Sequence, residues 1–337
     1  MKIKTQDFLS ILSSIKPGID QKGLIENTDN FIFTEQYIAS FNDNICIIYP
    51  FKGEFKCSVP AEELYQTIKC FDNNLLDIFI DNNLLNIIDN NTVVKLKIDY
   101  ADDIINIIDS FQITNKKMKN LPKDFLEALS LCRLSVLKDK QRPAMNCIFI
   151  EDEYMASTDG MRISEYHLSQ SMDCSILLPV FSVNYLLNYP IKYFYLTSRW
   201  VFFKTDNLFF CSRLIDSEFP NYEKIFRDFK SSRKINFPEN IKSKLQPAII
   251  FAEGDNKYDK SIHLEIKNNK LICKSQNDYG SLLIKEDYKN EENINISFDI
   301  NPYFLLEILK YTQTFKYNDT KILFKSNSFN HIIALLK

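Results

Sequence analysis

One short stretch of this sequence contains side chains that could carry out acid–base chemistry. Asp159 and Arg162 lie three residues apart, and Glu165 and His167 follow closely. Such groups exchange protons when they converge in a pocket and their pKa values shift toward the working pH. No nucleophile motif accompanies them, and six glycines in the whole chain argue against a loop that cradles phosphate. An enzyme is therefore only an alternative, in which Asp159→Ala would abolish activity.

Metal-binding residue types are present but lack a ligand pattern. The eight cysteines are scattered, at positions 46, 57, 70, 132, 147, 174, 211 and 273, without a Cys-x-x-Cys pair. The histidines also follow no metal-ligand spacing; they are His167, His263 and His331. The sequence therefore predicts buried, reduced thiols in a cytoplasmic protein, with neither a metal nor another cofactor.

Composition and charge are those of an ordinary globular protein. Of the 337 residues, 45% are hydrophobic and 25% are charged. The sequence has no run of about 18 apolar residues, the length that spans a membrane. The stretch from Met1 to Asp7 turns polar too early for a secretory signal. The net charge of −3 argues against indiscriminate coating of nucleic acid, although basic residues could still gather on one inner surface.

Two helix-like patterns recur along the chain with nearly one period. The first pattern, an acidic or amide residue followed by apolar positions, starts at Asp7, Asp124 and Asn240. The second, with apolar residues at every fourth position, starts at Pro60, Pro179 and Ile300. Successive copies are therefore 116 to 121 residues apart. Two markers that recur together predict three copies of one domain.

Each copy is predicted to open with one helix, followed by strands, a second helix midway and further strands. The first helices open at the first pattern, and the second helices span 60–70, 179–188 and 301–311. Strand-like runs lie at 31–33, 45–48, 84–88, 147–150, 200–203 and 322–324. This order predicts an α+β fold in which the helices of each copy pack on one face of an antiparallel sheet. The polar stretches 115–120 and 227–234 divide the chain into domains 1–110, 111–230 and 231–337.

Three segments in the second copy carry a family resemblance. Arg142-Pro-Ala-Met-Asn-Cys-Ile-Phe-Ile150 precedes Ser157-Thr-Asp-Gly-Met-Arg-Ile163, and Leu214-Ile-Asp-Ser-Glu-Phe-Pro-Asn-Tyr-Glu-Lys-Ile-Phe226 follows. The combination resembles the bacterial sliding clamp, the beta subunit of the replicative DNA polymerase. That family has a Thr-Asp-Gly-His-Arg turn and a Phe-Pro-Asp-Tyr segment in the same order. With the three copies, the resemblance covers essentially the whole chain.

The resemblance implies a protein without catalytic activity that acts by topology. Two copies would form a head-to-tail homodimer, a ring of six domains around duplex DNA, which tethers the polymerase. Contacts to phosphate would be loose and independent of sequence. The implied DNA-contacting residues lie on or just after the first helix of each copy; they are Lys22, Lys138, Lys140, Arg142, Lys257 and Lys260. A solvated surface side chain is the alternative for each of them.

The resemblance also implies a groove for short peptide motifs of the polymerase and the clamp loader. Matched residue by residue, its lining is Met145, Thr158, Gly160, Met161, Arg162, Ile163, Pro220, Ile225, Ile332, Ala334, Leu335 and Leu336. An apolar groove anchors one or two large partner side chains, while the turn backbone and Arg162 would fix the rest. The alternatives are a plain turn at Asp159-Gly160 and a structural pairing role for Arg162.

The sequence departs from the family at two places in this groove. The family usually has His where Met161 stands, and its last residues contain a proline that Ala334-Leu335-Leu336-Lys337 lacks. Methionine keeps the bulk and gains adaptability but loses a polar partner. We therefore interpret the chain as a divergent clamp, encoded by a phage or another mobile element. The alternative is a monomeric, clamp-like module that captures clamp-binding peptides without encircling DNA.

Overall fold

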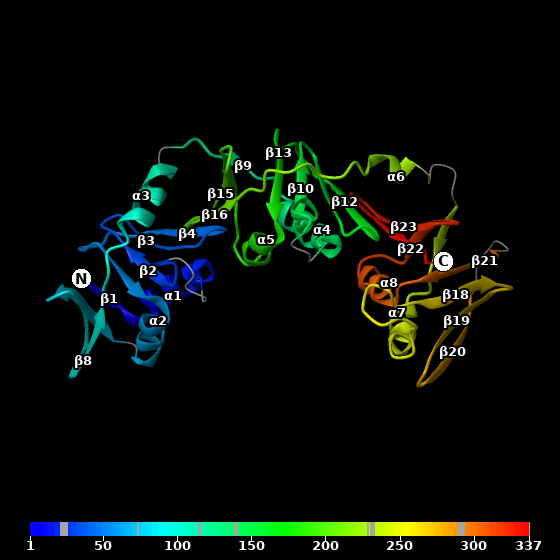
Figure 1. Ribbon diagram of the computed structural model, residues 1–337, viewed down its shortest axis with the longest axis horizontal. Coiled ribbons are helices and arrows are strands. Elements are labelled where there is room, and N and C mark those ends of the chain that lie inside the picture. The colour runs from blue at the N-terminus through cyan, green and yellow to red at the C-terminus, as the bar shows by residue number, and fades with distance from the viewer. Residues whose placement is uncertain are drawn as a thin grey trace. The chain divides into compact units, whose positions relative to one another are not determined.

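The described residues fall into two units that share the middle of the sequence (Figure 1). The computed structural model describes residues 1–20, 26–72, 74–113, 116–137, 141–227, 229, 233–288 and 294–336. The first unit comprises Met1–Leu121 and Leu178–Asp216, and the second comprises Pro122–Leu177 and Ser217–Lys337. The predicted second domain therefore contributes residues to both units.

Two antiparallel sheets and their helices build the first unit. The four-stranded sheet has the order β1-β6-β7-β8, at Lys2–Lys4, Leu75–Asp81, Leu84–Asp89 and Thr92–Lys97. The eight-stranded sheet has the order β5-β2-β3-β4-β16-β15-β14-β9, at Cys57–Pro60, Asn30–Phe33, Tyr37–Phe41, Ile45–Pro50, Phe209–Arg213, Trp200–Lys204, Tyr193–Leu196 and Lys119–Asn120. The α-helices are α1 (Thr5–Ile15), α2 (Ala61–Cys70), α3 (Asp102–Ser110) and α5 (Val180–Leu186).

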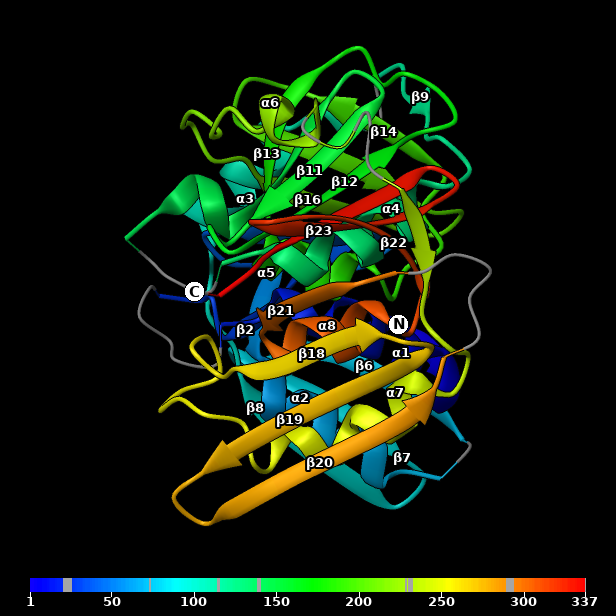
Figure 2. The same ribbon diagram turned by 90° about the vertical axis from the view of Figure 1, so that its right-hand side faces the viewer.

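The second unit repeats this plan. Its eight-stranded sheet has the order β13-β10-β11-β12-β24-β23-β22-β17, at Ser175–Pro179, Cys147–Glu151, Tyr154–Thr158, Arg162–His167, Phe329–Ala334, Lys321–Ser326, Thr314–Asn318 and Lys234–Asn236. Its four-stranded sheet has the order β20-β19-β18-β21, at Gly280–Asp287, Lys270–Asn277, Ile262–Lys267 and Ile296–Ile300 (Figure 2). The α-helices are α4 (Phe125–Cys132), α6 (Glu223–Arg227), α7 (Ile241–Leu245) and α8 (Pro302–Ile308).

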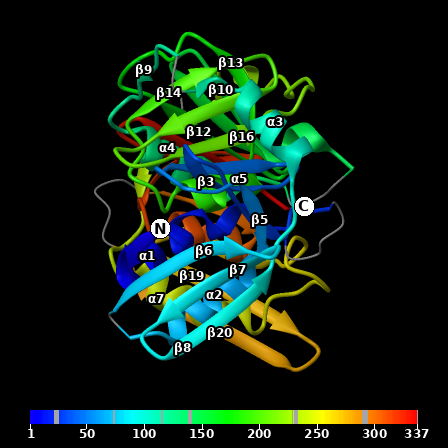
Figure 3. The same cartoon turned by 90° about the vertical axis from the view of Figure 1, so that its left-hand side faces the viewer.

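Helix α1 shows why the repeated pattern forms helices. Phe8, Ile11, Leu12 and Ile15 are buried at the i, i+3, i+4 and i+7 spacing of one helix face. The helix ends before Gly18, where a Cβ atom would lie only 2.1 Å from Oγ of a serine on β3. Helices α1 and α2 lie beside the four-stranded sheet (Figure 3).

The six helices predicted from the repeats are present. They are α1, α4 and α7 as first helices and α2, α5 and α8 as second helices. Helices α3 and α6 were not predicted. Among the described residues, no helix has the length and apolar content to cross a membrane. All eight cysteines are free, but the predicted burial is wrong for Cys70, which is exposed, and Cys174 is only half-buried.

Helix α3 and the segment around α6 cover corresponding positions on the two large sheets. Ile104, Ile105 and Ile108 of α3 belong to an apolar cluster with residues of β2, β3, β4, β15 and β16. In the second unit, Tyr222 and Phe229 pack on β11, β12, β23 and β24 in the same manner. The covering of the second sheet is the less regular one, because α6 has only five residues.

Each large sheet joins strands from two predicted domains. In the first unit β4 pairs with β16, and in the second unit β12 pairs with β24. The partners in these two junctions are related by nearly the sequence period of the repeats, because β12 begins 117 residues after β4 and β24 begins 120 residues after β16. This agrees with the repeat, although the boundaries at residues 110 and 230 stay a prediction.

Candidate functional site

A tight turn between β11 and β12 carries several of the predicted groove residues. Asp159 Oδ1 accepts hydrogen bonds from the backbone N–H groups of Met161 at 3.0 Å and Arg162 at 2.9 Å. The Thr158 hydroxyl donates to the carbonyl oxygen of Arg162 at 2.9 Å and accepts from the N–H of Gly160 at 3.1 Å. Gly160 has a φ of +89°, which favours glycine. The Thr-Asp-Gly sequence therefore builds a turn that presents Met161.

Arg162 ties this turn to α8. Its Nε donates to Asp159 Oδ2 at 2.9 Å, and its Nη1 donates to Glu307 Oε2 at 2.5 Å. The guanidinium carbon lies 4.1 Å from the centre of the Phe304 ring. Only 7% of the Arg162 side chain and 1% of the Asp159 side chain are exposed. These contacts support the structural pairing role for Arg162.

Three predicted groove residues pack in one apolar cluster on the large sheet. Ile163 on β12 and Ile332 on β24 are register partners and are both buried. Ile225 of α6 is half-buried against the same cluster. Phe219 and Tyr222, whose rings are 5.8 Å apart, complete it. The structure thus gathers these three residues in one place.

Met145 and Pro220 lie at the edges of this arrangement. Met145 is buried, and its Cε would lie 3.7 Å from a Cβ atom on Gly160, so it packs under the turn. Pro220 is exposed, and its neighbour Phe219 stacks on Phe149 with ring centres 5.0 Å apart.

The C-terminal segment runs past the turn and is half-buried at Ala334, Leu335 and Leu336. The N–H of Ala334 donates to the carbonyl oxygen of Met161 at 2.8 Å. The N–H of Leu336 donates to the carbonyl oxygen of Asp299 at 2.9 Å, which extends the contact to β21. Met145, Thr158 and Ala334 therefore contact the turn, whereas Ile163, Ile225 and Ile332 belong to the apolar cluster on the sheet.

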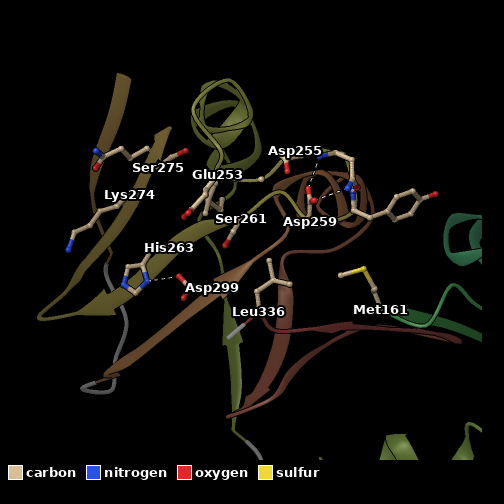
Figure 4. A pocket seen from close by; sticks show the side chains of 15 residues that line it. Met161, Glu253, Asp255, Asp259, Ser261, His263, Lys274, Ser275, Asp299 and Leu336 are labelled. Carbon is tan, nitrogen blue, oxygen red and sulfur yellow. Dashed lines mark hydrogen bonds and ion pairs between the residues drawn. The ribbon is translucent and has the colours of Figure 1, made fainter. Parts of the chain in front are cut away.

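A pocket of about 770 Å³ opens beside Met161 and Leu336 (Figure 4). The rest of its lining is mostly polar: Glu253, Gly254, Asp255, Asn256, Tyr258, Asp259, Ser261, Ile262, His263, Lys274, Ser275, Gln276 and Asp299. His263 Nδ1 and Asp299 Oδ1 are 2.8 Å apart across the β18–β21 pair. The sequence analysis missed this pocket apart from Met161 and Leu336.

A buried histidine lies next to the groove. His331 Nδ1 shares a hydrogen bond with the Ser164 hydroxyl at 2.9 Å, and that hydroxyl bonds Ser135 at 2.8 Å. His331 Nε2 has no hydrogen-bond partner among the described residues. Burial, and to a lesser degree the positive charge of Arg162, lowers the pKa of His331 from 6.5 to about 3. His331 is therefore neutral at pH 7.

The acid–base residues weighed in the sequence are engaged in structural contacts. Asp159 is bound to the turn and to Arg162. Glu165 accepts a hydrogen bond from Asn330 at 3.0 Å, and burial raises its pKa. His167 lies beside the Tyr154 ring, with centres 5.0 Å apart. None of the four acid–base candidates, Arg162 included, lines the pocket of Figure 4.

The predicted DNA-contacting residues are only partly described. Lys22, Lys138 and Lys140 lie outside the described residues. Arg142 is exposed just before the short helix at Pro143–Asn146, and Lys257 is exposed with Nζ 5.6 Å from the centre of the Tyr303 ring. Lys260 is half-buried, and its Nζ donates to the carbonyl oxygen of Ala252 at 3.0 Å, so this lysine helps to hold its loop.

Other basic residues lie on or next to the helices and were not singled out from the sequence. Lys69 is in the last turn of α2 and Lys242 is in α7. Lys16 and Lys244 pair with Glu62 and Glu286 respectively, so part of their charge is offset. The helical periodicity of the surrounding sequence could have predicted that these lysines lie on the helices.

A curated protein sequence matches part of this chain. No protein-family model matches this sequence. The Beta sliding clamp of Rickettsia bellii is 28% identical over 218 residues, which cover 56% of this chain and 55% of that protein. The chain therefore spans about half the length of this curated relative in the matched region.

Solved structures match along essentially the whole chain. The DNA polymerase III subunit beta of Pseudomonas aeruginosa has a TM-score of 0.84 at 16% identity and covers 100% of this chain and 99% of its own. The beta subunit of Thermotoga maritima has a TM-score of 0.81 at 17% identity, over 100% and 98%. A sliding clamp of Bartonella birtlesii, solved bound to griselimycin, has a TM-score of 0.85 at 15% identity, over 100% and 99%. The chain has the fold of the bacterial sliding clamps, as the motifs around residues 142–163 and 214–226 predicted.

Proposed function

We propose that this protein is a sliding clamp that encircles duplex DNA and tethers a replicative polymerase for processive synthesis. The observation that carries the proposal is the match of the sliding-clamp fold over the full length of the chain. The proposed activity is topological rather than catalytic, because a ring keeps its partner at high local concentration on the DNA. Because the proposed ligand is duplex DNA, we place the protein in the cytoplasm. The proposed function requires no cofactor.

Two strands that end their sheets in the described part of the chain support a head-to-tail homodimer. Strand β8 ends the small sheet of the first unit, and β20 ends that of the second. Val93 on β8 is 52% exposed and Leu283 on β20 is 55% exposed. Exposed edges with apolar side chains are templates for pairing with another chain. Because the two edges are different surfaces, β8 of one copy and β20 of another would form two equivalent junctions and close a ring of two.

The groove around the β11–β12 turn is the proposed binding site for partner peptides. Met161, Leu335 and Leu336 are half-buried apolar residues at this turn, and the neighbouring strands carry the buried Ile163 and Ile332. Apolar anchors of a peptide bind such a surface, and the polymerase and clamp loader are the proposed sources of these peptides. Met161 in place of the family histidine makes the rim adaptable rather than polar.

DNA contact is proposed to be sparse. Arg142 and Lys257 are exposed and so available to phosphate, and Lys22, Lys138 and Lys140 stay predictions of the sequence. A small number of phosphate contacts favours sliding, because the contacts broken during one step then cost little free energy in total.

Solution mass separates the ring from the monomeric binding module. Light scattering over a hundredfold dilution should find a species near twice the subunit mass of 39.6 kDa. A monomer at every concentration would favour the module. A topological assay then tests the encircling itself: the protein should stay on linear duplex DNA only when both ends are blocked after it has threaded on. Equal retention on open and blocked DNA would rule out a ring.

A further inference from the structure

The polar pocket of Figure 4 adjoins the proposed peptide groove. It shares Met161 and Leu336 with the groove, and its other walls come from loop 253–259 and from β18, β19 and β21. Met161 enters from the β11–β12 turn and Leu336 from the C-terminal segment. A peptide whose apolar side chain rests on these two residues therefore has its neighbouring residues at the mouth of the pocket.

Carboxylates outnumber cations in the lining. The acidic residues are Glu253, Asp255, Asp259 and Asp299. Against them the lining holds one lysine, Lys274, and the ring of His263, which bonds Asp299. Neither Glu253 nor Asp255 pairs with a cation within the described ranges. Lys257 and Lys260 belong to the same stretch of chain but do not line the pocket, so the charges that face the pocket are mostly negative.

The loop that carries three of these acids is held in one shape. Asp259 accepts hydrogen bonds from the backbone N–H and the side-chain amide of Asn256, both at 2.7 Å. Gly254 has a φ of +113°, and a Cβ atom there would lie 2.6 Å from the carbonyl oxygen of Asp259. Tyr258, 39% exposed, adds an aromatic face to the same pocket. A site held in this way loses little conformational freedom on binding, and aromatic faces attract cations.

We propose that this pocket selects partner peptides that carry a lysine or arginine next to their apolar anchor. The apolar anchor rests on Met161 and Leu336, and the basic side chain enters between Glu253, Asp255 and Tyr258. The proposal rests on the proposed peptide groove and adds a charge preference to it. Charge complementarity with the lining is its basis, and Lys274 is the lining residue that weakens it.

A peptide library tests the preference without a known partner. Random nine-residue peptides displayed on phage are selected against the full-length protein, and the selected peptides are sequenced. We expect Lys and Arg to be enriched beside an apolar anchor. Selection against Glu253→Gln/Asp255→Asn should lose that enrichment while keeping the anchor. Glu127→Gln/Glu239→Gln is the matched control, because it removes two exposed acidic charges of the second unit that lie outside the pocket.

The affinity of one selected peptide then measures the charge effect by fluorescence anisotropy. Replacing its basic residues with Gln should weaken binding roughly fivefold in low salt, a ratio set by two exposed ion pairs, and the difference should shrink in 0.5 M NaCl. Lys274→Gln should tighten binding of the basic peptide, a gain that damage to the fold would not produce.

The outcomes separate this proposal from the groove and from the ring. Apolar-anchored peptides without basic enrichment, or a Lys274→Gln variant that binds no tighter, would overturn the charge preference and leave the groove in place. Failure to select any apolar-anchored peptide would overturn both the preference and the groove. The mass and threading assays would still test the ring independently.

Discussion

Arg162 and Glu307 form an ion pair between two residues that are 145 positions apart in sequence, with Nη1 and Oε2 at 2.5 Å. The pair joins β12 to α8, which come from the predicted second and third domains. Asp159 completes the network from the other side of the guanidinium at 2.9 Å. The groove turn is therefore anchored to a helix rather than only to its own strands.

Removing this anchor should destabilise the second unit. In Arg162→Ala the Asp159 carboxylate, 1% exposed, loses its cationic partner. Breaking one side of a buried pair costs about 3 kcal/mol, so urea unfolding should show a fall in the free energy of unfolding near that value. Arg213→Ala is the control, because its pair with Asp43 is exposed at 3.9 Å and should matter by under about 0.5 kcal/mol. Equal losses in the two variants would show that the Arg162 network has no special role.

The proposed dimer depends on the exposed edge strands. Leu283→Glu on β20 or Val93→Glu on β8 places a charge in the proposed junction and should convert the dimer to a monomer in light scattering. Leu75→Glu is a matched control, since Leu75 is 58% exposed but lies on β6, which is paired on both sides. A dimer that survives both edge substitutions, or one that Leu75→Glu also disrupts, would contradict this interface.

Salt dependence should reveal phosphate contacts. Arg142→Gln/Lys257→Gln removes two exposed cations of the predicted DNA-contacting set. If both contact phosphate, the slope of log affinity for duplex DNA against log salt should fall by about 1.8, at about 0.9 for each contact. Lys267→Gln/Lys325→Gln removes two exposed cations on strands β18 and β23 and should leave the slope unchanged. An unchanged slope in the first variant would remove both residues from the DNA surface.

The sequence predicted those helices whose apolar stripe repeats with the domain period. Helix α3 was missed although Ile104, Ile105 and Ile108 carry a helical stripe, because the copy at the next position in the sequence is the short helix α6. The continuation of each large sheet from one predicted domain into the next was also missed. Backbone pairing such as β12 with β24 joins residues 163 to 171 positions apart and leaves no local pattern in either strand.

The candidate site was predictable to a similar degree. Motif matching placed Met161, Ile163 and Ile332 together, and the structure brings them to one turn and sheet face. The polar pocket was not predictable, because Glu253 and Leu336 meet only through tertiary packing. Phe219 and Tyr222 also pack in the apolar cluster. Both belong to the Phe-Pro-Asn-Tyr segment, which indicated the family but not this packing.

Buried neutral His331 should make the protein sensitive to mild acid. Its pKa is lowered by burial and by Arg162 from 6.5 to about 3, so the folded protein leaves it neutral where the unfolded chain binds a proton. Proton binding to the unfolded chain favours unfolding. His331 therefore has no effect on the pH dependence of stability above pH 6.5. As the pH falls from 6.5 toward 3, the free energy of unfolding decreases by about 1.4 kcal/mol for each pH unit.

The comparison of wild type with His331→Asn isolates this effect from the carboxylates that also titrate. Unfolding free energies measured in urea at pH 8, 7, 6 and 5 should fall more steeply below pH 6.5 for the wild type than for His331→Asn, while the two lines run parallel above pH 6.5. The asparagine can still bond Ser164, which now holds Nδ1 at 2.9 Å, so the variant keeps the local polar contact. Parallel lines across the whole range would mean that His331 binds its proton equally in both states, against its burial beside Arg162.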